Sequence, residues 1–347
     1  MKLGRIVGYL NKFYSATKHI EFSKKLFLFT NTIYARFGPK KEKVTNYPVY
    51  ALIEPTSRCN LKCEICIRND LPFDFGDMGF DNYKIIVDKL KGLIRVHLQG
   101  QGEPFLHKDI FRMINHASKK GIIVTTTSNG TLLNEDMAKK IMESGLDEIV
   151  ISIDSIHKET CESIRKGVKF DVLIGNVKRL SEMREDRKKP LKISISMTMI
   201  KDNLKEISEF IKFFSAMGID ELIFQRLLTN RFYVNHYETN FLKEQLISQQ
   251  ELNKEIDKHK TLAKRRNISI LFDEGRCNWL WSQIYINYMG DVNPCCLILD
   301  PNNPKLGNIL KQDFKTIWNS QEYKNLRRSL INKKEPSVCK GCRRLWK

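Results

Sequence analysis

The 347-residue sequence contains no secretory segment, no internal repeat and no low-complexity tract. Its nine cysteines are odd in number and clustered, so a disulfide framework is not indicated. These absences favour a reducing, cytoplasmic compartment and suggest that the cysteines bind metal. Acidic residues are comparatively scarce, since 40 aspartates and glutamates accompany 59 lysines and arginines, a net charge of +19. This charge predicts attraction to anionic partners, although a generally lysine-rich surface would give the same number.

Residues 1–48 form a basic arm whose longest apolar run, Leu26 to Phe29, is too short to cross a bilayer or to serve as a signal-peptide core. Ile6, Leu10, Phe13 and Tyr14 have helical spacing, so we expect the arm to be helical and amphipathic. Such a helix either lies on an anionic membrane surface or packs across its own domain. The expected location is therefore cytoplasmic, with peripheral membrane contact left open.

From Tyr50 onward, apolar β-branched runs alternate with segments of helical period. Six runs predict strands, at 49–53, 94–99, 122–127, 148–153, 192–200 and 221–225. The predicted helices are 83–90, 110–120, 134–144, 172–187 and 204–217, and several are followed by a glycine suited to a left-handed conformation: Gly92, Gly121, Gly145 and Gly218. This order predicts an α/β fold, a parallel sheet curled into a barrel or part of one. Ligands of such folds bind at the carboxyl ends of the strands.

After Gln225 the alternation stops, and a polar stretch leads into a charged helix at 251–266 and a strand at 268–273. A cysteine-rich region begins at Cys277. We therefore expect four parts: the basic arm (1–48), a core domain (49–226), a connecting helical segment (227–266) and a small α+β domain (267–347).

Three cysteines, Cys59, Cys63 and Cys66, follow the first predicted strand with C-x3-C-x2-C spacing. A cubane [4Fe–4S] cluster normally takes four cysteines, so three thiolates leave one iron open. An open iron favours chemistry at the cluster. The alternative is a structural zinc site whose fourth ligand lies elsewhere in the chain.

This motif, placed after the first strand of a partial barrel, resembles the hallmark of the radical S-adenosylmethionine (radical SAM) superfamily. The resemblance implies a (β/α)6 TIM-like partial barrel with a [4Fe–4S] cluster on Cys59, Cys63 and Cys66. It implies that the open iron binds the amino and carboxylate groups of S-adenosylmethionine. An external one-electron reductant such as flavodoxin or ferredoxin would drive cleavage of that cofactor to a 5′-deoxyadenosyl radical, which abstracts hydrogen from a substrate.

Further matches follow the predicted strands in order. Gly102-Glu103-Pro104 is similar to the family's GGEP motif, with Gln101 in place of the first glycine, and by resemblance Glu103 receives the methionine amino group. Ser128-Asn129-Gly130 ends the third strand, and the resemblance implies cofactor contact for its polar residues. The other residues that match cofactor-binding positions are Ile65 (adenine), Ser152 and Asp154 (ribose or methionine), and Arg165 (methionine carboxylate).

The C-terminal region is similar to the SPASM/twitch extension of the same superfamily. It contains a hairpin-like segment with a turn at Gly290 before Pro294-Cys295, and a C-x2-C pair near the end. By resemblance Cys277, Cys295, Cys339 and Cys342 ligate one auxiliary [4Fe–4S] cluster, the twitch form. Cys296 is an alternative to Cys295, and a zinc ribbon is the alternative metal site. Cys161 is expected to be a small buried residue.

A fully ligated auxiliary cluster can accept the electron of a substrate radical, so the resemblance implies net oxidation or cross-linking of a small-molecule or lipid-linked substrate. The alternatives are a maturase of a ribosomally made peptide or protein and a non-catalytic iron–sulfur electron-transfer or binding protein. The arm lacks the strand pattern of a peptide-recognition domain, which counts against recognition in cis. Arg226, at the end of the sixth strand, is a catalytic candidate that could clamp a carboxylate or phosphate. No nucleic-acid recognition module is visible.

Overall fold

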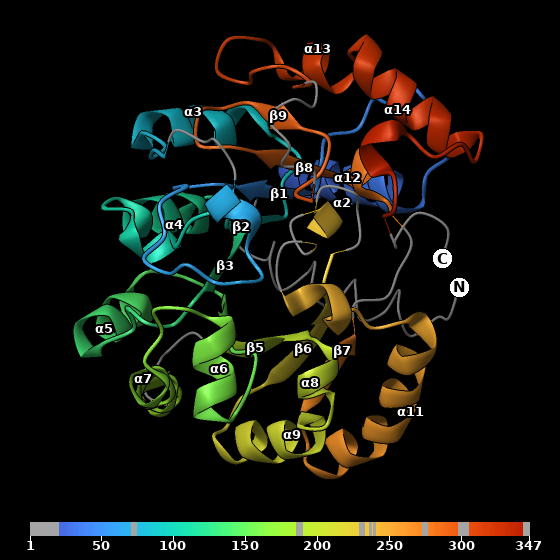
Figure 1. The fold of residues 1–347 in the computed structure, drawn as a ribbon. Coiled ribbons are helices and arrows are strands. Elements are labelled where there is room, and N and C mark those ends of the chain that lie inside the picture. The colour runs from blue at the N-terminus through green and yellow to red at the C-terminus, as the bar shows by residue number, and fades with distance from the viewer. Residues whose placement is uncertain are drawn as a thin grey trace. The chain divides into compact units, whose positions relative to one another are not determined.

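A computed structural model describes residues 21–70, 75–184, 190–228, 233–235, 238, 241–272, 277–297 and 305–342. The chain divides into two compact units whose segments alternate along the sequence. The first unit comprises residues 1–57, 76–125 and 277–338, and the second comprises 58–75, 126–276 and 339–347. Each unit contains parallel strands with helices beside them (Figure 1).

The first unit is built on β1 (Tyr50–Ile53), which pairs in parallel with β2 (Arg95–Leu98) on one side and with β8 (Gln283–Ile286) on the other. β9 (Val292–Asn293) returns antiparallel to β8. Ala51, Ile53, Val96 and Leu98 have no exposed surface, so apolar side chains of β1 and β2 form part of the core. The helices of this core are α3 (Phe80–Lys89) and α4 (Ile110–Lys119), with the 3₁₀ turn η2 (Pro104–Leu106).

Within the same unit, α2 (Phe22–Phe37) packs through a buried face that includes Leu28, Thr32 and Ala35. The chain after α2 is tied to the C-terminal helices α12 (Trp279–Ser282), α13 (Phe314–Trp318) and α14 (Gln321–Ile331). The indole Nε1 of Trp281 donates to the Lys41 carbonyl at 2.9 Å, and the guanidinium of Arg327 donates to the Glu42 carbonyl at 3.0 Å. The described part of the arm therefore packs on its own domain. The helix predicted around Ile6 to Tyr14 lies outside the described residues.

Within the described residues, the second unit contains four parallel strands in the order β4 (Glu148–Ser152), β5 (Lys192–Met199), β6 (Glu221–Arg226) and β7 (Ser269–Phe272). β3 (Ile123–Ser128) spans the boundary between the units. Its described helices are α5 (Glu135–Glu143), α6 (Lys158–Ile164), α7 (Phe170–Met183), α8 (Lys201–Leu204), α9 (Ile207–Ala216) and α11 (Gln249–Arg265), and its described 3₁₀ turns are η1 (Ile67–Asp70) and η4 (Phe241–Gln245). The turn η5 (Ser337–Cys339), like β3, spans the boundary between the units. α11 packs on β7 and α9.

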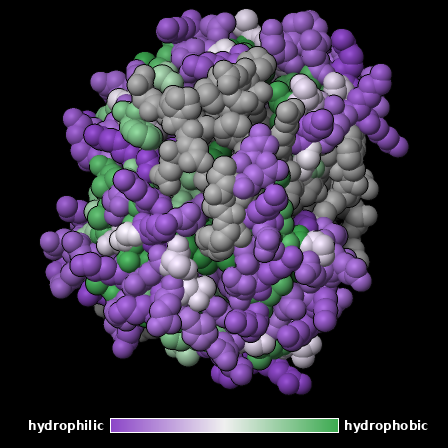
Figure 2. All heavy atoms as spheres, viewed as in Figure 1, coloured by the Kyte–Doolittle hydropathy of each residue, from purple (hydrophilic) through white to green (hydrophobic). Residues whose placement is uncertain are grey.

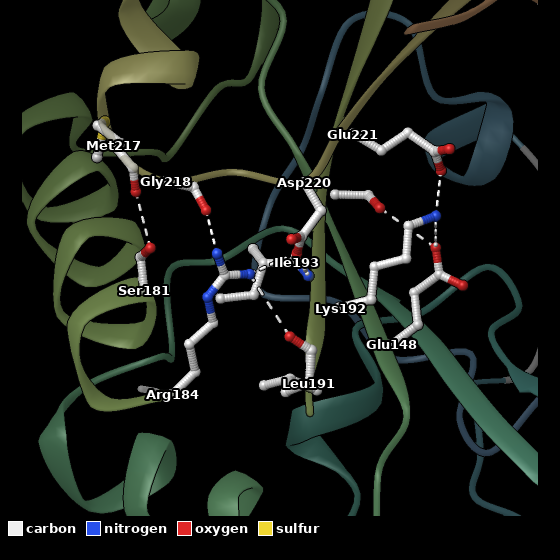
Figure 3. Close-up of polar contacts among 11 residues, drawn as sticks. Glu148, Ser181, Arg184, Leu191, Lys192, Ile193, Met217, Gly218, Asp220 and Glu221 are labelled. Atoms are coloured by element: carbon white, nitrogen blue, oxygen red, sulfur yellow. Dashed lines mark hydrogen bonds and ion pairs between the residues drawn. The ribbon is translucent and has the colours of Figure 1, made fainter. Parts of the chain in front are cut away.

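Ion pairs hold the amino ends of β5 and its neighbours together (Figure 3). The ammonium of Lys192 lies between the carboxylates of Glu148, at 2.9 Å, and Glu221. Burial lowers the pKa of Lys192, but the two carboxylates outweigh this effect and raise it overall. The guanidinium of Arg184 reaches Asp220 and the Gly218 carbonyl. These contacts stabilise the amino ends of the strands. Ligands of such sheets bind at the opposite, carboxyl ends.

The structure confirms the α/β fold with the parallel strands of a partial barrel and a small C-terminal domain. Two local details differ from the predictions. The helix predicted at 204–217 is present as α9 but starts at Ile207, because α8 ends at Leu204 and the chain turns before α9. Gly92 does not take a positive φ, unlike Gly121, Gly145 and Gly218; a Cβ there would lie 2.5 Å from the side chains of Asn31 and Tyr47. Gly92 therefore allows α2 to pack closely.

The face shown in Figure 2 is largely hydrophilic, with hydrophobic residues in separate small areas. This agrees with the excess of lysine and arginine in the composition. Among the described residues, no helix combines the length and the hydropathy that a membrane span requires.

Candidate active site

The loop that carries Cys59, Cys63 and Cys66, the cysteine loop, lies in the second unit. Backbone hydrogen bonds hold it to the end of α6 and to the segment that follows. The Lys62 amide donates to the Lys166 carbonyl at 3.0 Å, and the Glu64 amide donates to the Ile164 carbonyl at 2.9 Å. Within the loop, the Cys66 amide donates to the Cys63 carbonyl at 3.1 Å. Gly167 has a φ of 98°, and a Cβ there would approach Leu61 to 3.2 Å, so a glycine suits this close contact.

The three cysteines of this loop are half-buried, and none of them forms a disulfide. Burial raises the pKa of Cys63 to about 12, and although Arg165 acts in the opposite direction, it does not compensate. Burial also raises the pKa of Cys66. Arg68, which the sequence reasoning missed, is itself buried and donates to the Leu61 carbonyl at 3.0 Å. The protein's own hydrogen bonds therefore define the conformation of the cysteine loop.

Two predicted cofactor-binding residues, Asp154 and Arg165, form a buried ion pair with each other. The Arg165 Nε lies 2.7 Å from the Asp154 Oδ2, and the side chains are 9% and 0% exposed. The other oxygen of Asp154 accepts from the Thr198 amide at 2.7 Å. Asp154 and the nearby cysteines raise the pKa of Arg165 despite its burial, so the guanidinium stays charged. Asp154 thus orients the Arg165 guanidinium through its Nε, and the two NH₂ groups of the guanidinium can bind another anion.

Asn129, at the end of β3, reaches back to the cysteine loop. Its Nδ2 donates to the Asn60 Oδ1 at 2.9 Å and lies 3.9 Å from the Cys59 Sγ, while its Oδ1 accepts from the Thr131 amide. Ser128 is buried and accepts from the Gly130 amide at 3.0 Å. Ser152, at the end of β4, accepts a 3.3 Å bond from the Ser196 hydroxyl. The second unit therefore gathers the cysteine loop, Asn129 and the Asp154–Arg165 pair, whereas Ser152 is engaged with β5.

Glu103 lies in the first unit, where the loop after β2 leads into η2. Its side chain is 2% exposed and accepts from the Phe105 amide at 3.2 Å, which caps η2. Pro104 is buried as well, and Gly102 is half-buried. Ile65, on the cysteine loop of the second unit, is half-buried. The roles that the resemblance assigns to these residues stay predictions.

Glu54, which directly follows β1, was not singled out from the sequence. It is 3% exposed, its Oε1 accepts from the Gln101 amide at 2.7 Å, and its Oε2 accepts from the Tyr288 amide at 3.3 Å. Burial raises the pKa of this carboxyl to about 7, although these bonds and one from the Tyr285 side chain act against the shift. Within the first unit it joins the end of β1 to the loop after β2 and to the turn after β8. The signal in the sequence that could have identified Glu54 is an acidic residue directly after an apolar strand.

Arg226 is 8% exposed at the end of β6, and its Nη2 donates to the Gln249 Oε1 at 3.0 Å. This contact positions the start of α11. The neighbouring Gln225 is exposed. The role of Arg226 as a catalytic candidate stays a prediction.

The C-terminal cysteines are divided between the units. Cys277, Cys295 and Cys296 belong to the first and are half-buried, and Cys339 and Cys342 belong to the second. The predicted hairpin is confirmed, because Gly290 has a φ of 85° in the turn between β8 and β9. The Cys342 amide donates to the Cys339 carbonyl at 2.8 Å, which forms a tight C-x2-C turn. Cys161 is fully buried in α6, as expected.

Among the described residues, no three histidine, cysteine, aspartate or glutamate side chains lie close enough together to hold a single metal ion. A cubane cluster instead separates its protein ligands by its own width and binds them through thiolates. Three half-buried thiols on one ordered loop, beside a buried arginine that offsets negative charge, fit such a cluster. The donor set of the loop thus suits iron–sulfur chemistry better than one ion.

Two family descriptions match the chain: the radical SAM superfamily at residues 53–214 and an iron–sulfur cluster-binding domain, SPASM, at residues 277–343. The first match covers the cysteine loop and every predicted cofactor-binding residue. The second covers all the C-terminal cysteines.

Three known proteins illustrate the similarity over most of the chain. The tungsten-containing aldehyde ferredoxin oxidoreductase cofactor-modifying protein of Pyrococcus furiosus is 26% identical, over 84% of this chain and 86% of its own. The antilisterial bacteriocin subtilosin biosynthesis protein AlbA of Bacillus subtilis is 27% identical, over 79% of this chain and 60% of its own. The crystal structure of Streptococcus suis SuiB bound to precursor peptide SuiA aligns with a TM-score of 0.67 and 18% identity, over 88% of this chain and 70% of that one, which shows a shared fold.

Proposed function

Because the chain belongs to the radical SAM superfamily and carries a C-terminal SPASM domain, we propose that it is a radical SAM enzyme that oxidises or cross-links a peptide or protein substrate. The observation that carries the first half of this proposal is the loop of Cys59, Cys63 and Cys66 beside the Asp154–Arg165 pair. The peptide half is supported by the relatives. We therefore prefer a peptide substrate to the small-molecule or lipid-linked substrate that was expected from the sequence.

In this proposal the three thiolates of the cysteine loop would hold a [4Fe–4S] cluster with one iron left open for S-adenosylmethionine. When bound and reduced, this pair supplies a carbon radical that can abstract hydrogen from an unactivated carbon. The protein contributes the positioning. Arg165, oriented by Asp154, presents its free N–H groups to the methionine carboxylate, and Glu103 accepts from the methionine ammonium. Cys277, Cys295, Cys339 and Cys342 would hold an auxiliary cluster, which would supply an electron acceptor.

Cleavage of the cofactor tests the first half. The anaerobically reconstituted protein, given S-adenosylmethionine and a strong one-electron reductant, should release 5′-deoxyadenosine and methionine. Replacing Cys59, Cys63 and Cys66 by alanine should abolish this release while the auxiliary cluster's spectrum persists. If the protein binds iron but releases no 5′-deoxyadenosine, the result would favour the alternative of a non-catalytic electron-transfer protein.

Two relatives support a peptide substrate. AlbA is named for the biosynthesis of a bacteriocin, and SuiB was crystallised with its precursor peptide. The test is incubation with short peptides encoded beside the gene, followed by mass spectrometry for a product lighter by two hydrogen atoms. The second candidate is a non-peptide cofactor or metabolite, supported by the cofactor-modifying protein of Pyrococcus furiosus. Product formation from a small molecule, with every neighbouring peptide unchanged, would favour that candidate.

We also propose that α2 contacts an anionic membrane surface. Its outer face carries Phe22, Leu26 and Phe37, which are 77%, 51% and 47% exposed, opposite the packed face. A fluid bilayer can accept a convex apolar stripe of this kind, and the basic arm suits anionic headgroups. In liposome flotation, Leu26→Glu should reduce recovery with phosphatidylglycerol vesicles, whereas Ile85→Glu, a control at an exposed position of α3, should not. Equal flotation of the intact protein and one lacking residues 1–46 would end the proposal.

A further inference from the structure

A pocket of about 410 Å³ opens in the first unit, away from all the predicted site residues. It is lined by the first half of α2, by the end of α3 with the turn that leads into β2, and by residues 120–122 that lead into β3. These segments precede β2 and β3, so the pocket lies at the amino ends of the strands. Gly102-Glu103-Pro104 lies at the carboxyl end of β2. The pocket is therefore separate from the proposed cofactor site.

The floor of this pocket is apolar. Leu28, Val87, Leu90 and Leu93 line it and are each at most 4% exposed, because they also belong to the core. Phe27 borders the opening and is 41% exposed. A volume of this size is typical of pockets that take small molecules. An alkyl chain in contact with this floor would remove further apolar surface from water, which is favourable.

The rim of the pocket is cationic. Lys24, Lys91 and Lys120 line it together with one acidic residue, Asp88. Asp88 is already paired with Lys120 at 2.5 Å. Within the part of the chain that the structure describes, no ion pair involves Lys24 or Lys91, so two positive charges border an apolar floor. This arrangement complements a molecule with an apolar tail and an anionic head.

We propose that this pocket binds a single-chain amphiphile, with the alkyl tail on the leucine and valine floor and a phosphate or carboxylate head beside Lys24 and Lys91. Inorganic phosphate would meet only solvent-exposed lysines, whose pairing energy is small. A neutral amphiphile would leave the lysines without an anion. An acidic peptide is a poorer match, because its backbone needs hydrogen-bond partners and the lining side chains are apolar or charged.

The test is calorimetric titration of the full-length, iron-loaded protein with dodecyl phosphate below its critical micelle concentration. We expect one site per chain, with inorganic phosphate and dodecyl maltoside binding at least about tenfold more weakly. The double variant Lys24→Glu/Lys91→Glu should bind dodecyl phosphate about tenfold more weakly. Lys119→Glu, an exposed lysine outside the pocket, should bind like the wild type.

Three outcomes would overturn the proposal. Unchanged affinity in the double variant would place the binding elsewhere. Binding to phosphatidylglycerol vesicles without binding to dodecyl phosphate monomers would assign the lysines to a bilayer surface. Binding only after removal of residues 1–20 would mean that the chain's own amino-terminal segment occupies the pocket. Release of 5′-deoxyadenosine is an independent measurement, so failure of the proposed reaction would leave this result standing.

Discussion

The buried carboxyl of Glu54 predicts a specific dependence of stability on pH. The pKa of this group is raised from 4.5 to about 7, because burial penalises the charged form more than its three hydrogen bonds favour it. The folded protein therefore binds the proton more tightly than the unfolded chain. A shift of about 2.5 units, at about 1.4 kcal/mol each, corresponds to about 3 kcal/mol. This amount of stability is present below pH 4.5 and is lost as the pH rises to about 7.

Replacing Glu54 by glutamine removes this titration while keeping the shape of the side chain. The amide NH₂ cannot accept a hydrogen bond, so one of the two backbone N–H groups, of Gln101 or Tyr288, loses its partner at a cost of about 1–3 kcal/mol at any pH. At pH 5 the variant should be less stable than the wild type by about that amount. At pH 8 the two should be nearly equal, because the wild type then carries the cost of a buried charge.

The assay is urea unfolding of the reconstituted protein under anaerobic conditions at pH 5, 6, 7 and 8, followed by tryptophan fluorescence. Comparing the variant with the wild type at each pH cancels the contribution of the clusters. Glu143→Gln, at the exposed end of α5, is the matched control and should retain the wild-type pH dependence. A difference between Glu54→Gln and the wild type that stays constant from pH 5 to 8 would refute the reasoning.

Three other predictions concern separate parts of the chain. Lys192→Met should destabilise the protein by about 2 kcal/mol at pH 7 in urea unfolding, because it leaves two largely buried glutamates side by side; an unchanged unfolding midpoint would contradict this. Asp154→Asn should weaken binding of S-adenosylmethionine about tenfold in calorimetry, since Arg165 loses the charge that orients it, and should leave the iron content unchanged. Removing Cys339 and Cys342 together should lower the iron content from about eight to about four per chain, and zinc in the wild-type protein would contradict the cluster assignment.

The core of the fold followed from local patterns in the sequence. The six strands β1 to β6 were predicted within one or two residues, because apolar runs of four to eight residues flanked by polar turns have few other stable conformations in a protein of this size. The glycines after α4, α5 and α9 take positive φ as expected. The start of α9 was predicted too early, at Leu204 instead of Ile207.

The candidate site was predictable to the extent that its residues are neighbours in sequence. Cys59, Cys63 and Cys66 identify the loop by spacing alone. The partner of Arg165 was not predictable, because both it and Asp154 matched cofactor-binding positions and the sequence gives no sign that they bind each other. Glu54 was missed for a similar reason: its three partners come from the loop after β2, from β8 and from the turn after β8, all distant in the chain.

The sequence by itself determined the identity of the strands, the cysteine loop and the C-terminal hairpin, because each depends on periodicity or spacing over a dozen residues or fewer. The tertiary structure decided that β8 pairs with β1, that Lys192 lies between two carboxylates, and that Glu54 is withdrawn from water. Those outcomes depend on burial and on contacts between residues tens to hundreds of positions apart. The charge state of a side chain depends on such surroundings, so the raised pKa of Glu54 results from its burial in the fold and could not be predicted from the residue type alone.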